Sequence, residues 1–284
     1  MVMKALMYKY RNSSPPLQPY LKRYASTYQE YQTSWNPYCV KKDALLYQFV
    51  TGNEETEIEL IPDACLNALF ELDASAPCAM LYGASLQSTS FKLKPDTHYF
   101  GFKPYSNLGI KSPGINMREM VDTRVDLSYV YPSADRLIAD LSRTTSFSER
   151  IGIFSRFAEE NLVDDNYLPT FVDYLAVMLC SSRENIVFGS IGQAIGYSER
   201  YCREKFKDSY GMSPKQYSNI IRFQNALKAL VSDTYSDLTS LAVECGYFDQ
   251  PHLTREFRRY TNAPPERYLK RYNRLFGSKD ADPN

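Results

Sequence analysis

The segment Leu238–Arg259 reads LTSLAVECGYFDQPHLTREFRR, and the earlier segment Phe188–Lys207 reads FGSIGQAIGYSERYCREKFK. In both, apolar or small residues occupy positions 1, 4, 5 and 8, and a glycine follows at position 9, Gly246 or Gly196. This spacing predicts an amphipathic helix that ends at the glycine, because glycine readily adopts the positive φ that terminates a helix. A second amphipathic stretch and then a Pro-x-x-Tyr sequence follow in each copy.

The repeat, about 50 residues long, predicts two helix-turn-helix units. The second helix of such a unit enters the DNA major groove. A single copy would be equally consistent with a helical hairpin that has no nucleic-acid role, but two copies with matched turns and ends favour DNA binding. The positions that we expect to maintain the two units are Gly192, Gly196, Phe206, Ala242, Gly246, Phe257 and Pro265.

The segment from about residue 168 to 272 closely resembles the DNA-binding domain of AraC/XylS-type transcriptional regulators, a bacterial family. The most specific stretch is Leu241–Arg259, followed by Pro264-Pro265-x-x-Tyr268, and Arg222–Leu230 matches the family's linking helix. Two departures occur. Gly192 replaces the usual alanine and weakens its helix by about 0.5–1 kcal/mol, whereas Pro251 stands where a helix begins and tolerates proline.

The resemblance implies that both units of one monomer contact adjacent major grooves of double-stranded operator DNA, about 34 Å apart. We expect recognition helices at about 198–207 and 249–259, the second capped by Asp249. Arginine suits guanine, glutamate suits the cytosine amino group and glutamine suits adenine. The base-reading candidates are Glu199, Arg200, Arg203, Glu204, Gln250, His252, Thr254 and Arg255, and the phosphate-contacting candidates are Lys205, Lys207, Arg258 and Arg259.

A solvated surface role is the alternative for each of these side chains. It is favoured for Glu204, because a carboxylate near phosphates costs energy unless it meets a cytosine. Residues 185–284 hold 15 Lys and Arg against 11 Asp and Glu, whereas the whole chain holds 33 of each. This modest excess of positive charge permits binding to a polyanion without requiring it.

Metal and cofactor chemistry is disfavoured by the composition. The chain has two histidines, His98 and His252, and six cysteines with no Cys-x-x-Cys pair, so no metal site is expected. The cysteines are interpreted as reduced, mostly buried thiols. Common nucleotide-binding and hydrolase motifs are missing. We therefore expect no enzyme activity and no cofactor. No apolar run is long enough to span a membrane and no secretory signal is recognisable, so we expect a cytoplasmic protein.

The fold class that we predict is α+β and multidomain. Short apolar runs separated by turn residues predict a β-rich sensing or dimerisation domain over residues 1–130. A helical bridge follows over 131–165, then an all-α DNA-binding domain over 166–275 and a disordered tail over 276–284. The resemblance implies that the first domain is a small β-barrel. Ile61–Cys65 and Phe100–Pro104 resemble a subgroup with cupin-like N-terminal domains.

A barrel interior could hold a small-molecule effector. The candidate pocket residues are Phe70, Tyr82, Phe91, Phe100 and Phe102. The alternative is that these side chains only fill the core. In the bridge, the stripe of Phe147, Ile151, Phe154 and Phe157 could form a homodimer interface or be buried within the monomer.

Three functions remain. The first is a sequence-specific transcriptional regulator gated by an effector, with RNA polymerase as an expected partner and with activation and repression both open. The second is a ligand-independent regulator whose N-terminal half dimerises or binds a protein. The third, a cupin-like enzyme with a DNA-binding tail, is disfavoured by the scarcity of histidine.

Overall fold

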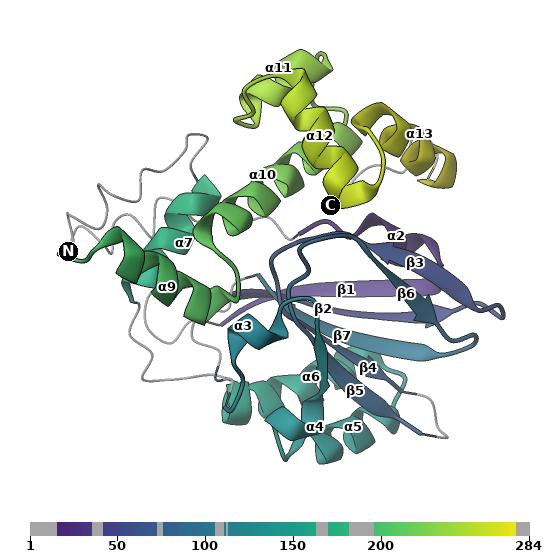
Figure 1. Cartoon of the computed structure of the whole chain (residues 1–284). Coiled ribbons are helices and arrows are strands. Elements are labelled where there is room, and N and C mark those ends of the chain that lie inside the picture. The colour runs from purple at the N-terminus through teal and green to yellow at the C-terminus, as the bar shows by residue number, and fades with distance from the viewer. Residues whose placement is uncertain are drawn as a thin grey trace.

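The computed structural model describes residues 16–35, 42–72, 76–105, 111, 113–162, 170–181 and 196–276. Strands and short helices form the N-terminal half, and helices alone form the C-terminal half, as predicted from the sequence. In Figure 1 the strands fan across the lower part of the molecule and the C-terminal helices lie above and beside them.

The N-terminal half contains two antiparallel sheets. The larger has the order β1-β2-β7-β4-β5-β8, and β3 pairs with β6 in the smaller. Among the described residues no pairing joins β1 to β8, so the larger sheet is open at its edges. The strands are β1 (Ala25–Trp35), β2 (Lys42–Thr51), β3 (Thr56–Leu60), β4 (Asn67–Glu71), β5 (Cys78–Tyr82), β6 (Thr89–Leu93), β7 (His98–Pro104) and β8 (Arg124–Asp126).

One face of the larger sheet is covered by helices α4 (Leu127–Val130), α5 (Ala134–Ser142), α6 (Phe147–Phe157) and the π-helix η1 (Ala158–Leu162). Phe154 and Phe157 are buried there, and the ring of Phe154 lies 4.7 Å from that of Phe102. The stripe on α6 therefore packs against the sheet of its own chain. For these two rings the structure supports burial within the monomer and not a dimer interface.

The opposite face of the sheet carries stacked aromatic rings and is covered by α2 (Pro19–Arg23) and the β3–β6 pair. The Phe49 and Tyr99 rings lie 4.9 Å apart, and Tyr47 crosses above Gly101. A Cβ atom at Gly101 would lie 2.0 Å from the Tyr47 ring, so glycine is required for this packing. The two faces of one sheet thus belong to two separate clusters of buried side chains.

The C-terminal half is built from α7 (Phe171–Ser181), α9 (Glu199–Tyr210), α10 (Pro214–Val231), α11 (Leu238–Glu244), α12 (Gln250–Thr261) and α13 (Pro265–Phe276). Its core also includes Ile61, Ala64 and Ala84 from the N-terminal half. The buried Gln224 of α10 donates to the Pro62 carbonyl over 2.7 Å and accepts from the Leu17 amide over 2.9 Å. The two halves are therefore joined by both apolar packing and buried hydrogen bonds.

Among the described helices, none combines the length and the apolar character needed to cross a bilayer.

Candidate nucleic-acid interface

The second helix-turn-helix unit consists of α11, a turn and α12. Asp237 caps α11 by accepting from the amides of Thr239 and Ser240. Gly246 has a φ of 77° in the turn, as the sequence pattern predicts. Asp249 accepts from the His252 amide over 2.7 Å and so begins α12 at the expected place. The turn glycine and the Asp249 cap that the sequence predicts for this unit are therefore both present.

The inner side of α12 is fixed by buried rings and by one ion pair between the buried Glu256 and the half-buried Arg222. Leu253 and Phe257 have no exposed area, and the Phe257 ring lies 5.1 Å from that of Phe223 on α10. Glu256 accepts from Arg222 of α10 over 3.2 Å, and the Arg222 guanidinium lies 4.8 Å from the Tyr247 ring in the turn. Sequence reasoning did not identify this ion pair. These contacts tie α12 to both α10 and the turn, which holds the helix in a defined orientation.

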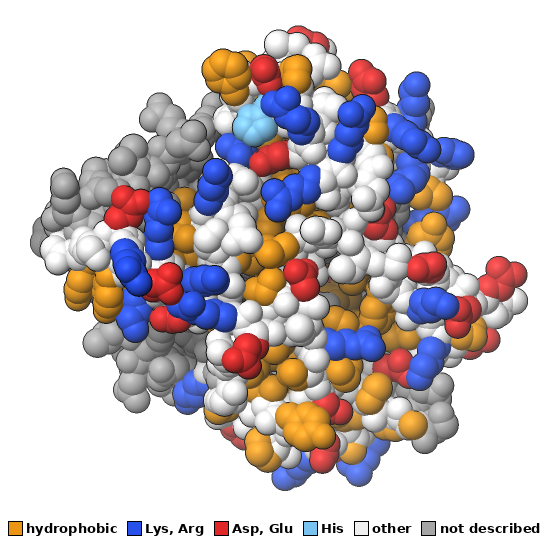
Figure 2. Space-filling view, viewed as in Figure 1, with side chains coloured by type: hydrophobic (Ala, Val, Ile, Leu, Met, Phe, Trp, Pro, Cys, Tyr) orange, Lys and Arg blue, Asp and Glu red, His pale blue; other side chains and the backbone are white. Residues whose placement is uncertain are grey.

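The outer side of α12 carries the side chains that were predicted to contact DNA. Arg255, Arg258 and Arg259 are exposed. The other three predicted readers, Gln250, His252 and Thr254, are half-buried. Figure 2 shows Lys and Arg side chains gathered around this upper part of the molecule.

Two of the half-buried readers already have partners within their own unit. Gln250 accepts from the Thr239 hydroxyl over 3.2 Å, and the Nδ1 atom of His252 accepts from the Phe248 amide over 3.5 Å. Both would have to exchange these contacts to read a base, whereas Arg255 is free to approach the groove without such an exchange.

The first unit is described from Gly196 onward, and the expected first helix of this unit, with Gly192, lies outside the described residues. Ser198 caps α9 by accepting from the Tyr201 amide over 3.2 Å, and Gly211 ends the helix with a φ of 77°. Cys202 and Phe206 are fully buried, as predicted. The inner side of α9 thus resembles that of α12.

The outer side of α9 differs from that of α12 because its charges are mixed. Glu199 and Arg203 form an ion pair along the helix. Arg200, Lys205 and Lys207 are exposed, and the Lys205 ammonium lies 5.8 Å from the Tyr201 ring. In Figure 2 acidic and basic side chains alternate over this helix.

Glu204, a predicted base reader, is bound by the N-terminal half. It accepts from Arg118 Nη2 over 2.7 Å, and Asp208 one turn later accepts from Arg118 Nε over 2.8 Å. The hydrogen bond from Arg118 lowers the pKa of the Glu204 carboxyl. Arg118 was not identified from the sequence, because no local pattern relates it to a helix about 90 residues away. Glu204 is therefore committed to a contact within the protein in this arrangement.

The five predicted effector-pocket residues do not line one cavity. Phe70, Phe100 and Phe102 belong to the cluster under α6, whereas Tyr82 and Phe91 contact each other on the opposite face of the sheet. The expectation of a single pocket was therefore wrong. Side chains alternate along a strand, and Tyr82 directly follows Leu81, which faces the α6 side.

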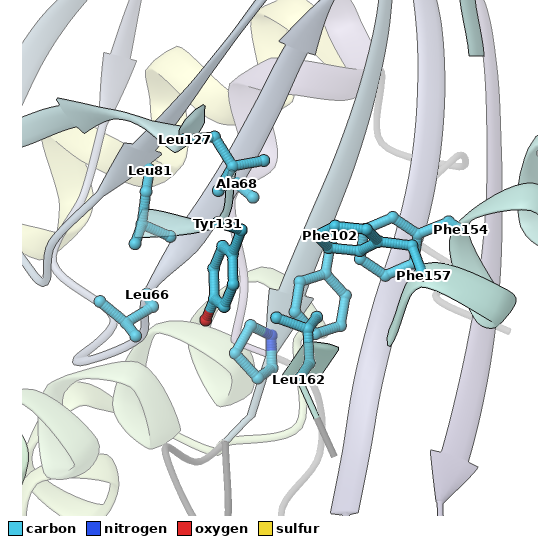
Figure 3. Close-up of a pocket in the computed structure, with 10 residues that line it drawn as sticks. Leu66, Ala68, Leu81, Phe102, Leu127, Tyr131, Phe154, Phe157 and Leu162 are labelled. Carbon is cyan, nitrogen blue, oxygen red and sulfur yellow. The ribbon is translucent and has the colours of Figure 1, made fainter. Parts of the chain in front are cut away.

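Two cavities lie on these two faces. The cavity under α6, shown in Figure 3, has a volume of about 20 Å³ and is lined by apolar side chains such as Phe102, Phe154 and Leu162. It has room for about one water molecule. The cavity on the other face has a volume of about 280 Å³ and is lined partly by Tyr82, Phe91 and the buried ion pair between Lys103 and Asp63. Of these two, the second is large enough for a small organic molecule.

Metal-binding groups are not gathered in the described part of the chain, where no three His, Cys, Asp or Glu side chains lie close enough to hold an ion. The five cysteines described are free of disulfide bonds, and Cys65 and Cys202 are buried. Burial raises the pKa of the Cys65 thiol well above its usual value, which keeps the thiol protonated at neutral pH.

Comparison with known families places a helix-turn-helix domain at residues 191–271. A curated protein of Staphylococcus aureus, named an uncharacterized HTH-type transcriptional regulator, is 23% identical over 113 residues, which cover 39% of this chain and 14% of the relative. The HTH-type transcriptional activator RhaS of Pectobacterium carotovorum is 29% identical over 82 residues, which cover 28% of this chain and 29% of RhaS. The matches thus span less than a third of these relatives.

Solved structures with similarity include the DNA-binding domain of AdpA in complex with a target DNA. That chain has 21% identity and a TM-score of 0.33, and the match covers 36% of this chain and 93% of the AdpA domain. A structure of ToxT from Vibrio cholerae has 14% identity and a TM-score of 0.39, and the match covers 86% of this chain and 98% of ToxT.

Proposed function

We propose that this chain, whose residues 191–271 match a helix-turn-helix domain and resemble the AraC/XylS type in sequence, is a sequence-specific DNA-binding transcriptional regulator. The observation that carries the proposal is the construction of α12. Buried contacts through Phe257 and Glu256 fix its inner side, while Arg255, Arg258 and Arg259 extend from its outer side. A rigid helix with exposed arginines suits the major groove, where arginine reads guanine.

The second unit supplies the strongest reading element under this proposal. Arg255 lies in the second turn of α12, within reach of base edges once the helix N-terminus enters the groove. Arg258 and Arg259 lie near the end of the helix, where contacts to phosphates position the protein without reading sequence. Arg200, Arg203 and Lys207 play the corresponding roles on α9, in a second, adjacent groove.

Selection of duplexes from a random library with the purified full chain tests this function. We expect a recovered motif with two half-sites about 10–10.5 base pairs apart. The selected duplex should bind at least about 1,000-fold more tightly than a scrambled duplex of the same length. A library that converges on no motif, with equal affinity for the scrambled duplex, would contradict the proposal.

The N-terminal half supports a second level of the proposal, which is gating by a small molecule. The cavity of about 280 Å³ lies beside the junction between the halves. Its wall residue Asp63 accepts from Gln18, and the neighbouring Pro62 carbonyl accepts from Gln224 of the DNA-binding half. A ligand in this cavity would therefore lie next to buried hydrogen bonds that join the sensor to α10.

Thermal unfolding in the presence of a metabolite library tests the gating, because a ligand that binds only the native state raises the apparent stability. A compound that stabilises the wild type should have a smaller effect on Tyr82→Ala, which alters the cavity wall. Tyr129→Ala is the matched control, since Tyr129 is 89% exposed and does not line the cavity. If no compound shifts the transition, the result favours an N-terminal half that dimerises or contacts a protein such as RNA polymerase.

A further inference from the structure

The two recognition helices carry opposite charges at two matched positions on their outer sides. Alignment of Phe206 with Phe257 places Glu204 opposite Arg255 and Asp208 opposite Arg259. Glu204 and Asp208 each follow a buried residue, Cys202 or Phe206, by two positions, which is a rotation of roughly 200° around the helix. Both carboxylates therefore project from the side of α9 that faces away from the core of its unit.

Carboxylates on this side oppose DNA binding, because the approaching surface is lined by negatively charged phosphates. In the structure they have a different partner. Arg118 donates to Glu204 over 2.7 Å and to Asp208 over 2.8 Å, so one guanidinium bridges two acids that lie one helical turn apart. The same guanidinium also donates to the Glu204 backbone carbonyl over 3.3 Å. The acidic pair thus matches a cation of the N-terminal half better than it matches DNA.

The backbone of the N-terminal half also lies close to α9. Arg118 belongs to the short helix α3 (Met117–Met120), which is adjacent to α9 in Figure 1. A Cβ atom at Gly211, the residue that ends α9, would lie 2.3 Å from the Met117 carbonyl oxygen and 2.7 Å from Val121. Glycine at this position therefore allows both the helix end and the close approach of α3. Contact between α3 and α9 extends beyond the charged side chains.

We infer that Arg118 determines the availability of the first recognition helix: α3 and Arg118 form a latch that keeps α9 from entering the major groove fully. The groove is about 12 Å wide and admits one helix, so α3 must withdraw before α9 can enter along its outer side. On α12 the N-terminal half contacts Asn262, which caps the end of the helix, through a 2.8 Å hydrogen bond to Ser88. The reading positions of α12 lie away from that contact. This inference rests on the proposed DNA-binding function.

The direction in which Arg118→Ala changes DNA affinity distinguishes the latch from a purely electrostatic contribution of Arg118. Arg118→Ala removes a positive charge, and if Arg118 had no role beyond its charge, affinity for a polyanion would fall or stay constant. Release of the latch predicts the opposite, a dissociation constant for the selected duplex that is lower by about fivefold, as expected for loss of two exposed ion pairs. Arg136→Ala is the control, because Arg136 is exposed on α5 and pairs with Asp140 of the same helix. It should change affinity by less than about twofold.

A double-mutant cycle then tests whether the acids and Arg118 act together. The variant Glu204→Gln/Asp208→Asn should bind more tightly than the wild type, and Arg118→Ala in that background should give no further tightening. Hydroxyl-radical footprinting of the selected duplex should show stronger protection of the groove contacted by the first unit in Arg118→Ala than in the wild type.

The latch would be overturned if Arg118→Ala bound the selected duplex as tightly as the wild type or more weakly. It would also be overturned if the effects of Arg118→Ala and of Glu204→Gln/Asp208→Asn on affinity were fully additive. Either result would leave the proposed function intact. If selection from the random library yields no motif, both the proposed function and the latch are contradicted.

Discussion

The recognition helices α9 and α12 are nearly the same on the inside and different on the outside. Each buries a phenylalanine with no exposed area, Phe206 or Phe257, and each is capped by a side chain that accepts from a first-turn amide. On the outside, α12 presents arginines where α9 presents acids bound to Arg118. The inner pattern is constrained by packing, whereas the outer positions are available for different partners.

A second difference lies at the boundary between the two sides. Glu256 of α12 is buried against Arg222, whereas the matched residue of α9 is Lys205, which is exposed. The second unit is therefore tied to α10 by an ion pair at a position where the first unit has a solvated lysine. At this position α12 has an ion pair with α10, whereas α9 contacts α10 through Phe206, whose ring lies 5.4 Å from that of Tyr217.

The largest expected effects test the shared interior. Phe206→Ala and Phe257→Ala should each reduce the free energy of unfolding by about 3–5 kcal/mol, because each leaves a cavity in a packed core. Urea denaturation of the full chain measures both. Phe248→Ala is the control, since Phe248 is 89% exposed and its loss should cost less than about 0.5 kcal/mol. If only one of the two variants loses little free energy of unfolding, the interiors of the two units are not equivalent.

The next effect tests the ion pair of the second unit. Glu256→Ala leaves the half-buried Arg222 guanidinium without its carboxylate and should reduce the free energy of unfolding by about 2–3 kcal/mol. Lys205→Ala, at the matched position of α9, should change it by less than about 0.5 kcal/mol. Thermal and urea unfolding of the two variants provide the comparison. Equal costs for both variants would show that the ion pair between Arg222 and Glu256 does not stabilise the second unit.

The next prediction concerns the arginines on the outer sides of α9 and α12, which we expect to read bases. Arg255→Ala and Arg203→Ala should each weaken binding to the selected duplex by about 1–3 kcal/mol and relax specificity at one base position. The effect of Arg203→Ala should be larger in the Arg118→Ala background, because α9 then enters its groove. Fluorescence anisotropy with the selected duplex and its single-base variants measures these changes. Unchanged affinity in both variants would remove these arginines as base readers.

The smallest effects concern the caps. Ser198→Ala and Asp249→Ala each remove a side-chain acceptor at the start of a recognition helix, and each should cost about 1 kcal/mol of stability. Ser198→Asp should restore the first cap, because aspartate also accepts from first-turn amides. A restoring variant that remains as unstable as Ser198→Ala would argue that the Ser198 contact does not stabilise α9.

Features that depend on neighbours in the chain were predictable from the sequence. The positive φ of Gly196 and Gly246, the Asp249 cap and the buried Phe206 and Phe257 all follow from local spacing. The resemblance to a known family then supplied the interpretation of two such units as a DNA-binding domain, and the predicted β-rich half is present as two antiparallel sheets.

Features that depend on tertiary packing were not predictable. Arg118 meets Glu204 only because α3 lies against α9, and no pattern near either residue indicates this. The prediction that five aromatic residues line a single effector pocket was wrong for a related reason. The sequence of a short strand does not reveal which face each side chain reaches, because that depends on the phase of the strand in the sheet, and Tyr82 lies on the opposite side from Phe70.

The central claim, that this chain reads DNA sequence with two helix-turn-helix units, is tested most directly by mapping where the tagged protein binds across the genome of its host. Binding of the purified chain to the recovered sites would then be titrated against salt. We predict a few sharp sites that share a motif spanning two adjacent major grooves, with a specific affinity that persists when phosphate contacts are screened. Diffuse occupancy, with affinity that follows phosphate number and salt alone, would contradict the account.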